Sequence, residues 1–310
     1  MNTILALIRR EILEGRNGFV LTPVILAVIA MVLVSLTLMG FGQMAFFEGA
    51  EAHNVLSFRD AVERMQYHRP DDWPAGVMAG YWLMTMPVWI VLPFIVFFSL
   101  LGTLYEERRD RSILFWKSMP VPDWQEVLVK LAVPVFIVPI IYLVVTISAQ
   151  LLIAVLLSVV MLVQGGDISA MWPIGLMFEV WLSGIGGGFV YGLWLLPIAA
   201  WVLFVSSFAD RMPFMWAVLP PVLLIVIEAM FNGSYGFMRW VFMHGGGWMR
   251  SMRISHLEDF DGPREMLMAV SGGPFTDILA RSVMHGHFWT GLLIAAAFTY
   301  GAIVMRKKAL

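Results

Sequence analysis

Six long apolar runs are the feature of this sequence that most limits how the chain can fold. A helix needs about 20 consecutive apolar residues to cross the hydrocarbon core of a bilayer. Backbone polar groups in a bilayer must also be paired internally, so runs of this length form helices. The sequence therefore predicts an all-α, polytopic membrane protein with six transmembrane helices, near residues 19–41, 77–104, 131–163, 189–206, 213–231 and 288–305.

The composition agrees with this fold class. Of the 310 residues, 60% are hydrophobic and 14% are charged, whereas ordinary soluble domains have about 25% charged residues. So few charges exclude a soluble enzyme and a nucleic-acid-binding protein, and no nucleic-acid partner is expected. The chain has no cysteine, which excludes disulfides and Cys-based metal sites.

Two of the runs leave details open. The third is long enough to tilt or to protrude from the membrane. Residues 171–188, before the fourth run, are also apolar and end in a glycine-rich stretch, so they could form a separate re-entrant or interfacial helix. The first run is not expected to be a cleaved signal peptide, because its charges follow a short apolar stretch and no small-residue cleavage site comes after it.

The distribution of Lys and Arg predicts the orientation. Twelve of the 20 lie in short segments that would be cytoplasmic if the N-terminus is cytoplasmic, and all six His then lie outside. Both termini are then cytoplasmic, as six spans require. Residues 1–310 form a single transmembrane domain with outer loops at 42–76 and 232–287 and a cytoplasmic segment at 105–130. The second outer loop carries helix-like pieces near 263–270 and 274–284.

The N-terminal segment has the pattern of an amphipathic helix. Over residues 3–16, Leu5, Ile8 and Ile12 fall on one face and the charges lie elsewhere. Such a helix is expected to lie in the interface plane, so residues 1–17 would form an elbow before the first span. The alternative is a positively charged anchor with no further role.

Segment 105–130 carries the strongest functional signal. The second span is expected to continue as a helix through the charged run, until Pro120 and Pro122 end it. Asp123 is predicted to cap a new helix, with Glu126 as its capping-box partner. Exposed aromatic residues beside these charges indicate a docking site for another chain. The alternative is an aromatic belt at the membrane interface.

The stretch EERRDRSILFWKSMPVPDWQ, residues 106–125, resembles the coupling region of permease subunits of ABC-2-type transporters. The six spans, the amphipathic N-terminal helix and the basic C-terminus match the same family along essentially the whole chain. The outer loop at 232–287 is longer than in compact members. The resemblance implies an exporter subunit of the bacterial cytoplasmic (inner) membrane. Its ATPase-coupling residues would be Glu106, Glu107, Arg108, Arg111, Phe115, Trp116, Lys117, Pro120 and Asp123.

The resemblance also implies partners. Two permease chains, as a homo- or heterodimer, would pair with two separate P-loop ATPase subunits. No G-x-x-x-x-G-K-[ST] motif occurs in the 310 residues, so the chain is not expected to hydrolyse ATP itself. ATP and Mg²⁺ would be bound by the partner, and no cofactor is expected on this chain. Besides these chains, its surroundings would be membrane lipids.

Three polar residues within the spans, Tyr142, Gln150 and Glu228, are candidates for lining a substrate path, because polar groups at membrane depth are costly. Interhelical hydrogen bonding is the alternative for the first two. The pair His285-x-His287 is a weak metal motif, and no metal site is expected.

Three other functions compete with the exporter. One is a membrane-embedded enzyme or metal-handling protein with a His-based outer site, and another is a non-transporting anchor of an ATPase. A secondary transporter would need charges at mid-membrane depth, and the spans have almost none.

Overall fold

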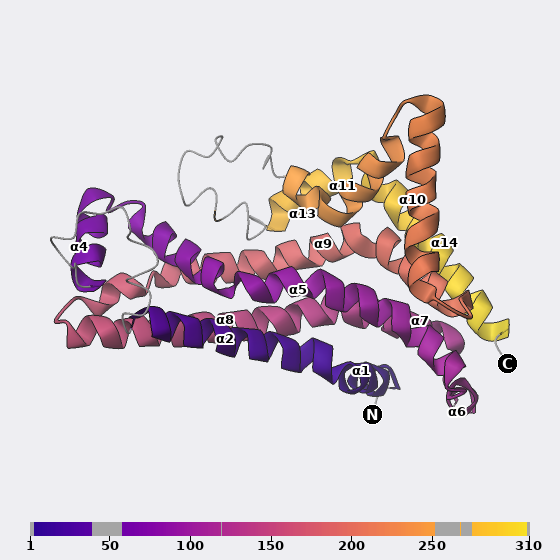
Figure 1. Ribbon diagram of the computed structural model, residues 1–310, viewed down its shortest axis with the longest axis horizontal. Helices are drawn as coiled ribbons and strands as arrows, with labels where there is room; N and C mark the ends of the chain where they lie inside the picture. The colour runs from indigo at the N-terminus through magenta and orange to yellow at the C-terminus, as the bar shows by residue number, and fades with distance from the viewer. Residues whose placement is uncertain (1–2, 39–57, 119, 252–266, 268–274, 309–310) are drawn as a thin grey trace.

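The computed structural model describes residues 3–38, 58–118, 120–251, 267 and 275–308, and every regular element in these residues is helical (Figure 1). Six helical segments are long and apolar enough to cross a bilayer, which confirms the predicted multi-pass membrane fold. They are Asn17–Leu38, Trp73–Arg109, Asp123–Val163, Ile168–Phe208, Pro213–Asn232 and Gly286–Lys308.

Shorter elements separate or extend these spans. In chain order the elements are α1 (Thr3–Glu14), the π-helix η1 (Asn17–Leu21), α2 (Thr22–Leu38), α4 (Phe58–His68), α5 (Trp73–Arg109), α6 (Ile113–Lys117), α7 (Asp123–Ala132), the π-helix η2 (Val133–Ile137), α8 (Val138–Val163), the 3₁₀ helix η3 (Ile168–Met171), α9 (Ile174–Phe208), α10 (Pro213–Asn232), α11 (Gly236–Ser251), α13 (Phe275–Met284) and α14 (Gly286–Lys308).

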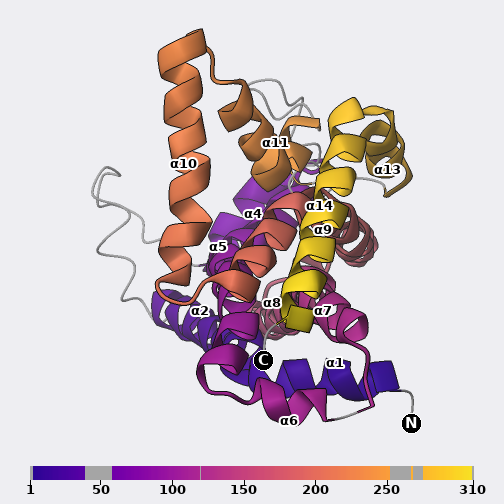
Figure 2. The same ribbon diagram turned by 90° about the vertical axis from the view of Figure 1, so that its right-hand side faces the viewer.

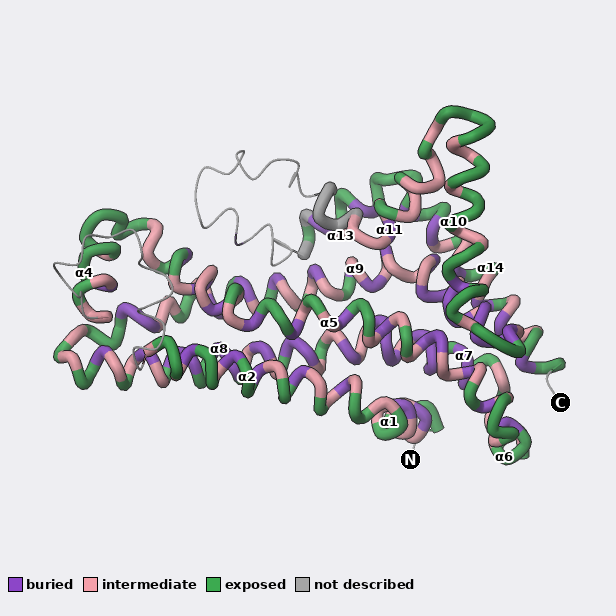
Figure 3. The backbone as a smooth tube through the Cα atoms, viewed as in Figure 1, coloured by how far each residue is buried: buried purple, intermediate pink, exposed green. Residues whose placement is uncertain are grey.

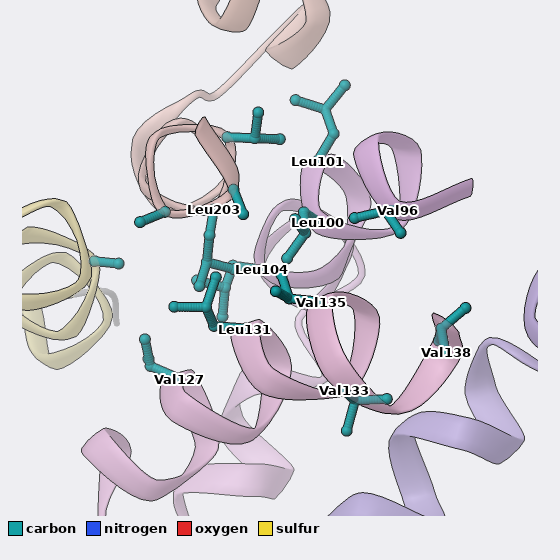
Figure 4. Close-up of a cluster of buried hydrophobic side chains, with 14 of the residues drawn as sticks. Val96, Leu100, Leu101, Leu104, Val127, Leu131, Val133, Val135, Val138 and Leu203 are labelled. Carbon is teal, nitrogen blue, oxygen red and sulfur yellow. The ribbon is translucent and has the colours of Figure 1, made fainter. Parts of the chain in front are cut away.

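Four long helices, α2, α5, α8 and α9, run along the long axis of the molecule (Figure 1). Their shared core is built from branched aliphatic residues, such as Val96 and Leu100 of α5 and Leu203 of α9 (Figure 4). Buried positions form stripes on the inner faces, whereas the outer faces stay exposed (Figure 3). Since the exposed positions of these helices are also apolar, the bundle has the surface of a membrane-embedded protein.

The fourth span is one continuous helix. The 35 residues of α9 include the apolar stretch before residue 189 and its glycines, so the alternative of a separate re-entrant helix over 171–188 is wrong. Of residues 171–188, those at 171–173 lie outside this helix. Because neighbouring helices pack against it, glycine within a membrane helix allows close approach instead of ending the helix.

Gly192 is one position where α9 lies very close to the backbone of another element. A Cβ atom there would lie 2.7 Å from the Phe136 ring and 3.2 Å from the Val135 carbonyl oxygen of η2. We expect Gly192→Ala to destabilise the protein by about 1–3 kcal/mol, the usual cost of overpacking. Gly188→Ala is the control, because a Cβ there meets no atom within 4 Å. Reversible unfolding in mixed micelles measures both, and equal stabilities would contradict this packing.

The fifth span, α10, stands apart from the bundle (Figure 2). Ala217 is the buried residue of this helix, and its carbonyl oxygen accepts a hydrogen bond from Trp201 Nε1 of α9 at 2.9 Å. The large side chains along α10 are apolar and exposed. This surface suits a helix surrounded by lipid or by another membrane-embedded chain.

The segments predicted as outer loops contain helices. The helix-like piece near 274–284 is confirmed as α13, whereas the piece near 263–270 lies outside the described residues except for Leu267. The helix α11 was not predicted. Both α11 and α13 pack against α9, so the described part of this loop lies on the bundle. In the other loop, α4 spans residues 58–68 and α5 begins at residue 73, and residues 42–57 are not described.

Candidate functional site

The segment with the strongest sequence signal lies at one end of the bundle, together with α1, α7 and both ends of the chain (Figure 1). There α1 runs across the bundle end, with α6 beneath it (Figure 2). Elements from the start, middle and end of the sequence therefore meet in one place. We call this end the network end, after the charges described below.

The second span continues as a helix into the charged run, as predicted, but it ends at Arg109, before Asp110 and Arg111 of that run. The prolines do not end this helix. Instead, Arg111 adopts a left-handed backbone conformation with φ 57°, which a helix cannot continue through. A separate short helix, α6, follows, and the prolines separate it from α7. The segment is thus a helix end, a turn, a short helix and a second turn.

The next helix starts at Asp123 as predicted, but the expected capping box is absent. The N-cap position is Pro122, and no side chain caps this helix. Asp123 and Glu126 instead pair with Arg306 of α14. A buried guanidinium needs carboxylate partners, and this requirement overrides the local capping pattern. Such a tertiary partner could not be read from spacing within the segment.

Glu107, near the end of α5, is the centre of a buried group of charges. One carboxylate oxygen, Oε1, lies 2.7 Å from the Arg10 guanidinium and 3.0 Å from Lys130 Nζ. The other, Oε2, accepts a hydrogen bond from Arg306 at 2.6 Å. These three cations belong to α1, α7 and α14. One carboxylate therefore joins four helices that are far apart in the sequence.

Three further acids surround the same cations, so the group has four acids and three cations. Glu126 pairs with Arg306 and, at 3.2 Å, with Arg10. Glu11 lies 2.7 Å from Lys130 Nζ, and Asp123 lies 3.4 Å from Arg306. Because the three cations are surrounded by carboxylates, their burial is compensated. We call this set the charge network: Arg10, Glu11, Glu107, Asp123, Glu126, Lys130 and Arg306.

Arg10 also connects α6 to the charge network. Its guanidinium carbon lies 3.5 Å from the centre of the Trp116 ring, in cation–π geometry. Burial opposes the charge on Arg10, but the carboxylates of Glu14, Glu11 and Glu107 hold its pKa above the ordinary value. Arg10 therefore stays protonated, and Trp116 is fixed against a permanent cation.

Sequence reasoning missed Arg10, Glu11, Lys130 and Arg306 as parts of the site, and assigned Glu126 only a capping role. The sequence did contain a sign that Glu126 and Lys130 are buried. Glu126 and Lys130 are four residues apart and so share a helix face, and their neighbours Val127 and Leu131 are apolar. Charged residues that alternate with apolar residues at the start of a membrane span indicate that the charges are buried in ion pairs. Nothing in the sequence indicates that Arg306 is the partner.

The predicted coupling residues fall into three groups. Glu107 and Asp123 belong to the charge network, and Trp116 packs on it. Arg108 and Lys117 bind backbone carbonyls: Arg108 those of Ser206 and Ala209 at 3.1 and 2.6 Å, and Lys117 that of Lys307 at 3.3 Å. The remaining predicted residues are exposed at the surface: Glu106, Arg111, Phe115 and Pro120.

An apolar surface lies next to the charge network. Leu114, Phe115 and Trp124 have exposed fractions of 57%, 62% and 48%. The Phe115 ring packs edge-on against Trp116, with ring centres 4.9 Å apart, so it is held by the residue that Arg10 fixes. We call Leu114, Phe115 and Trp124 the docking surface. Aromatic side chains are enriched at protein–protein interfaces relative to the rest of the protein surface.

Two of the three candidate path residues make hydrogen bonds between helices. Gln150 Nε2 donates to Thr85 at 3.3 Å and its Oε1 accepts from Trp181 at 2.8 Å. The Tyr142 hydroxyl donates to the Gly18 carbonyl oxygen at 2.8 Å. That carbonyl lies in the π-helix η1, where the expected donor is the backbone N–H five residues later. The residue at that position is Pro23, which has no N–H. Both residues thus have a structural use, and a role in a substrate path stays a prediction.

Glu228, the third candidate, lies near the end of α10. Its carboxylate accepts hydrogen bonds from the backbone N–H groups of Gly236 and Phe237, at 2.9 and 2.8 Å, and from the Ser234 hydroxyl at 2.8 Å. It therefore caps the N-terminus of α11, where a negative charge is favourable. Its predicted place on a substrate path is not tested by these contacts.

His244 of α11 is buried between aromatic rings. The centres of the Trp194 and Trp240 rings lie 5.3 and 4.1 Å from the centre of the imidazole. The ring nitrogens face the carbonyl oxygens of Trp240 and His287, and burial lowers the pKa of His244. Among the described residues, no group of three or more His, Cys, Asp or Glu side chains is placed to hold a metal ion.

Comparison with known proteins gives no relatives: no family model matches the chain, and neither a curated protein nor a solved structure is detectably similar to it.

Proposed function

We propose that this chain is the permease subunit of an ATP-driven, ABC-2-type exporter, and that its network end lies in the cytoplasm and docks a separate ATPase. The observation that carries the proposal is the docking surface. Leu114 and Phe115 are exposed beside charges on the short helix α6, which Arg10 holds from behind through Trp116, and Trp124 is exposed at the start of α7. Such a surface is costly in water unless a partner covers it.

The charge network supports a role in force transmission. A push on α6 would reach Arg10 through the contact with Trp116, and from there the carboxylates of Glu107 and Glu126. Both carboxylates also bind Arg306 of α14. Movement of the docked partner would therefore act on α1, α5, α7 and α14 together, as a rigid lever requires. In this scheme the coupling residues transmit force and perform no chemistry.

The complete exporter would contain two copies of the ATPase, which binds ATP and Mg²⁺, and two permease chains in a bacterial cytoplasmic membrane. The exposed apolar faces of α10 suit contact with a second permease chain or with lipid. The 310 residues contain no P-loop motif, so ATP hydrolysis falls to the partner.

Replacing Phe115 with serine tests the docking surface. We expect this change to reduce the ATPase that co-purifies with the tagged chain about tenfold or more, because buried interface aromatics carry much of the binding free energy. The control is Phe178→Ser on α9, since Phe178 has a similar exposed fraction of 65%. Its co-purification should be unchanged. Equal loss in both variants, or a co-purifying protein without a P-loop, would contradict the proposal.

The same preparation separates an exporter from a non-transporting anchor. Inside-out vesicles that hold the chain and its ATPase should hydrolyse ATP and accumulate substrate in a linked way. Hydrolysis with no transported lipid or peptide in the lumen would favour the anchor.

A further inference from the structure

The N-terminal helix α1 has two faces with different partners. The inner face carries Leu7 and Glu11, which are buried against the bundle. The outer face carries Leu5 and Leu13, both 59% exposed, and Arg9, which is also exposed. This differs in part from the sequence pattern, which placed Leu5 on the same face as the core-packed Ile8 and Ile12.

The helix α1 lies next to the end of the first membrane-spanning segment and runs across it. Only two residues separate α1 from the first membrane-spanning segment, Asn17–Leu38. Figure 1 shows α1 end-on and Figure 2 shows it lengthwise across the bundle end, so its axis is perpendicular to the spans. A helix in this place lies parallel to the bilayer, at the depth where a span emerges into the headgroups.

The exposed charge on the outer face of α1, and the one in the two residues that follow this helix, are positive. Arg9 and Arg16 are exposed, and neither forms an ion pair with the residues that the structure describes. The exposed acid of α1, Glu14, is already bound to Arg10 at 2.9 Å. Exposed leucines beside arginines match a lipid interface, because the leucines enter the acyl region while guanidinium groups reach phosphates.

We propose that the outer face of α1 binds anionic phospholipids, with Arg9 and Arg16 on the headgroup phosphates and Leu5 and Leu13 among the acyl chains. The site does not depend on the proposed ATPase. Its position gives it a second consequence, because Arg10 and Glu11 on the other side of the same helix hold Glu107 and Lys130. Bound anionic lipid therefore stabilises the charge network from outside.

The test is lipid binding by the full chain, measured by native mass spectrometry of protein titrated with phosphatidylglycerol or phosphatidylcholine in the same detergent. We expect tighter retention of phosphatidylglycerol. The double variant Arg9→Gln/Arg16→Gln should weaken that retention about tenfold or more, since each cation at a membrane surface contributes a few-fold in affinity. Phosphatidylcholine retention should not change.

The matched control is Arg64→Gln/Arg69→Gln. These two arginines are also exposed, and Arg64 lies on α4, at the opposite end of the bundle (Figure 1). The control should retain phosphatidylglycerol as the unaltered chain does, and Arg9→Lys/Arg16→Lys should keep most of the binding. Equal retention of the two lipids by the unaltered chain would overturn the proposal. So would a loss that is the same in the Arg9/Arg16 and Arg64/Arg69 variants.

Discussion

Glu107→Leu is expected to destabilise the folded protein by about 3–5 kcal/mol, the cost of removing one partner from a buried ion pair. The Glu107 carboxylate lies within 3.0 Å of Arg10, Lys130 and Arg306. Without it, Arg306 keeps Glu126 and Asp123, and Arg10 keeps Glu126 and its partners within α1. Among the described residues, Lys130 then keeps Glu11 as its one acidic partner. The loss can be measured by reversible unfolding in mixed micelles of detergent and denaturing surfactant.

The neighbouring residue supplies a matched control. Glu106 is exposed at the same helix end, so Glu106→Leu should change the free energy of unfolding by about 0.5 kcal/mol or less. The double variant Glu107→Leu/Arg306→Met should cost less than the sum of its two single changes, because it removes both buried partners together. Equal costs for Glu106→Leu and Glu107→Leu would show that the charge network does not stabilise the fold.

The spans could be predicted from the sequence because crossing a membrane depends on a continuous run of apolar residues and not on contacts between distant residues. A run of about 20 apolar residues is needed wherever the chain crosses, and this holds whatever the neighbours are. It was harder to predict that the fourth span is one continuous helix. The glycines before residue 189 suggested a break, and the packing of α9 against other helices, which keeps them helical, is not visible in the local sequence.

The charge network could not be predicted, because its partners lie far apart in the sequence. Asp123 and Glu126 had the spacing of a capping box, and only the arrival of Arg306 from α14 shows that these carboxylates serve another purpose. The same holds for Glu107, which the sequence placed in the cytoplasmic coupling segment as a partner-facing residue and which is buried in the structure. Phe115, by contrast, has the exposed position that its place beside charged residues predicted.

The absence of cysteine from the 310 residues allows a direct test of what covers the docking surface. A single cysteine introduced as Phe115→Cys can be loaded with a short thiol-reactive photo-cross-linker in native membranes. If the docking surface binds an ATPase, illumination should join the chain to one soluble polypeptide. Mass spectrometry of the adduct identifies that polypeptide without any assumption about its sequence.

The matched control is Phe178→Cys, because Phe178 has a similar exposure but lies near the start of α9, at the other end of the bundle (Figure 1). This control should give no adduct with the same polypeptide. The central claim of the account is that the network end docks a separate ATPase. It predicts that the polypeptide cross-linked to the Phe115→Cys variant contains a G-x-x-x-x-G-K-[ST] motif. A partner without that motif, or no protein adduct with this variant in membranes where the chain is active, would contradict it.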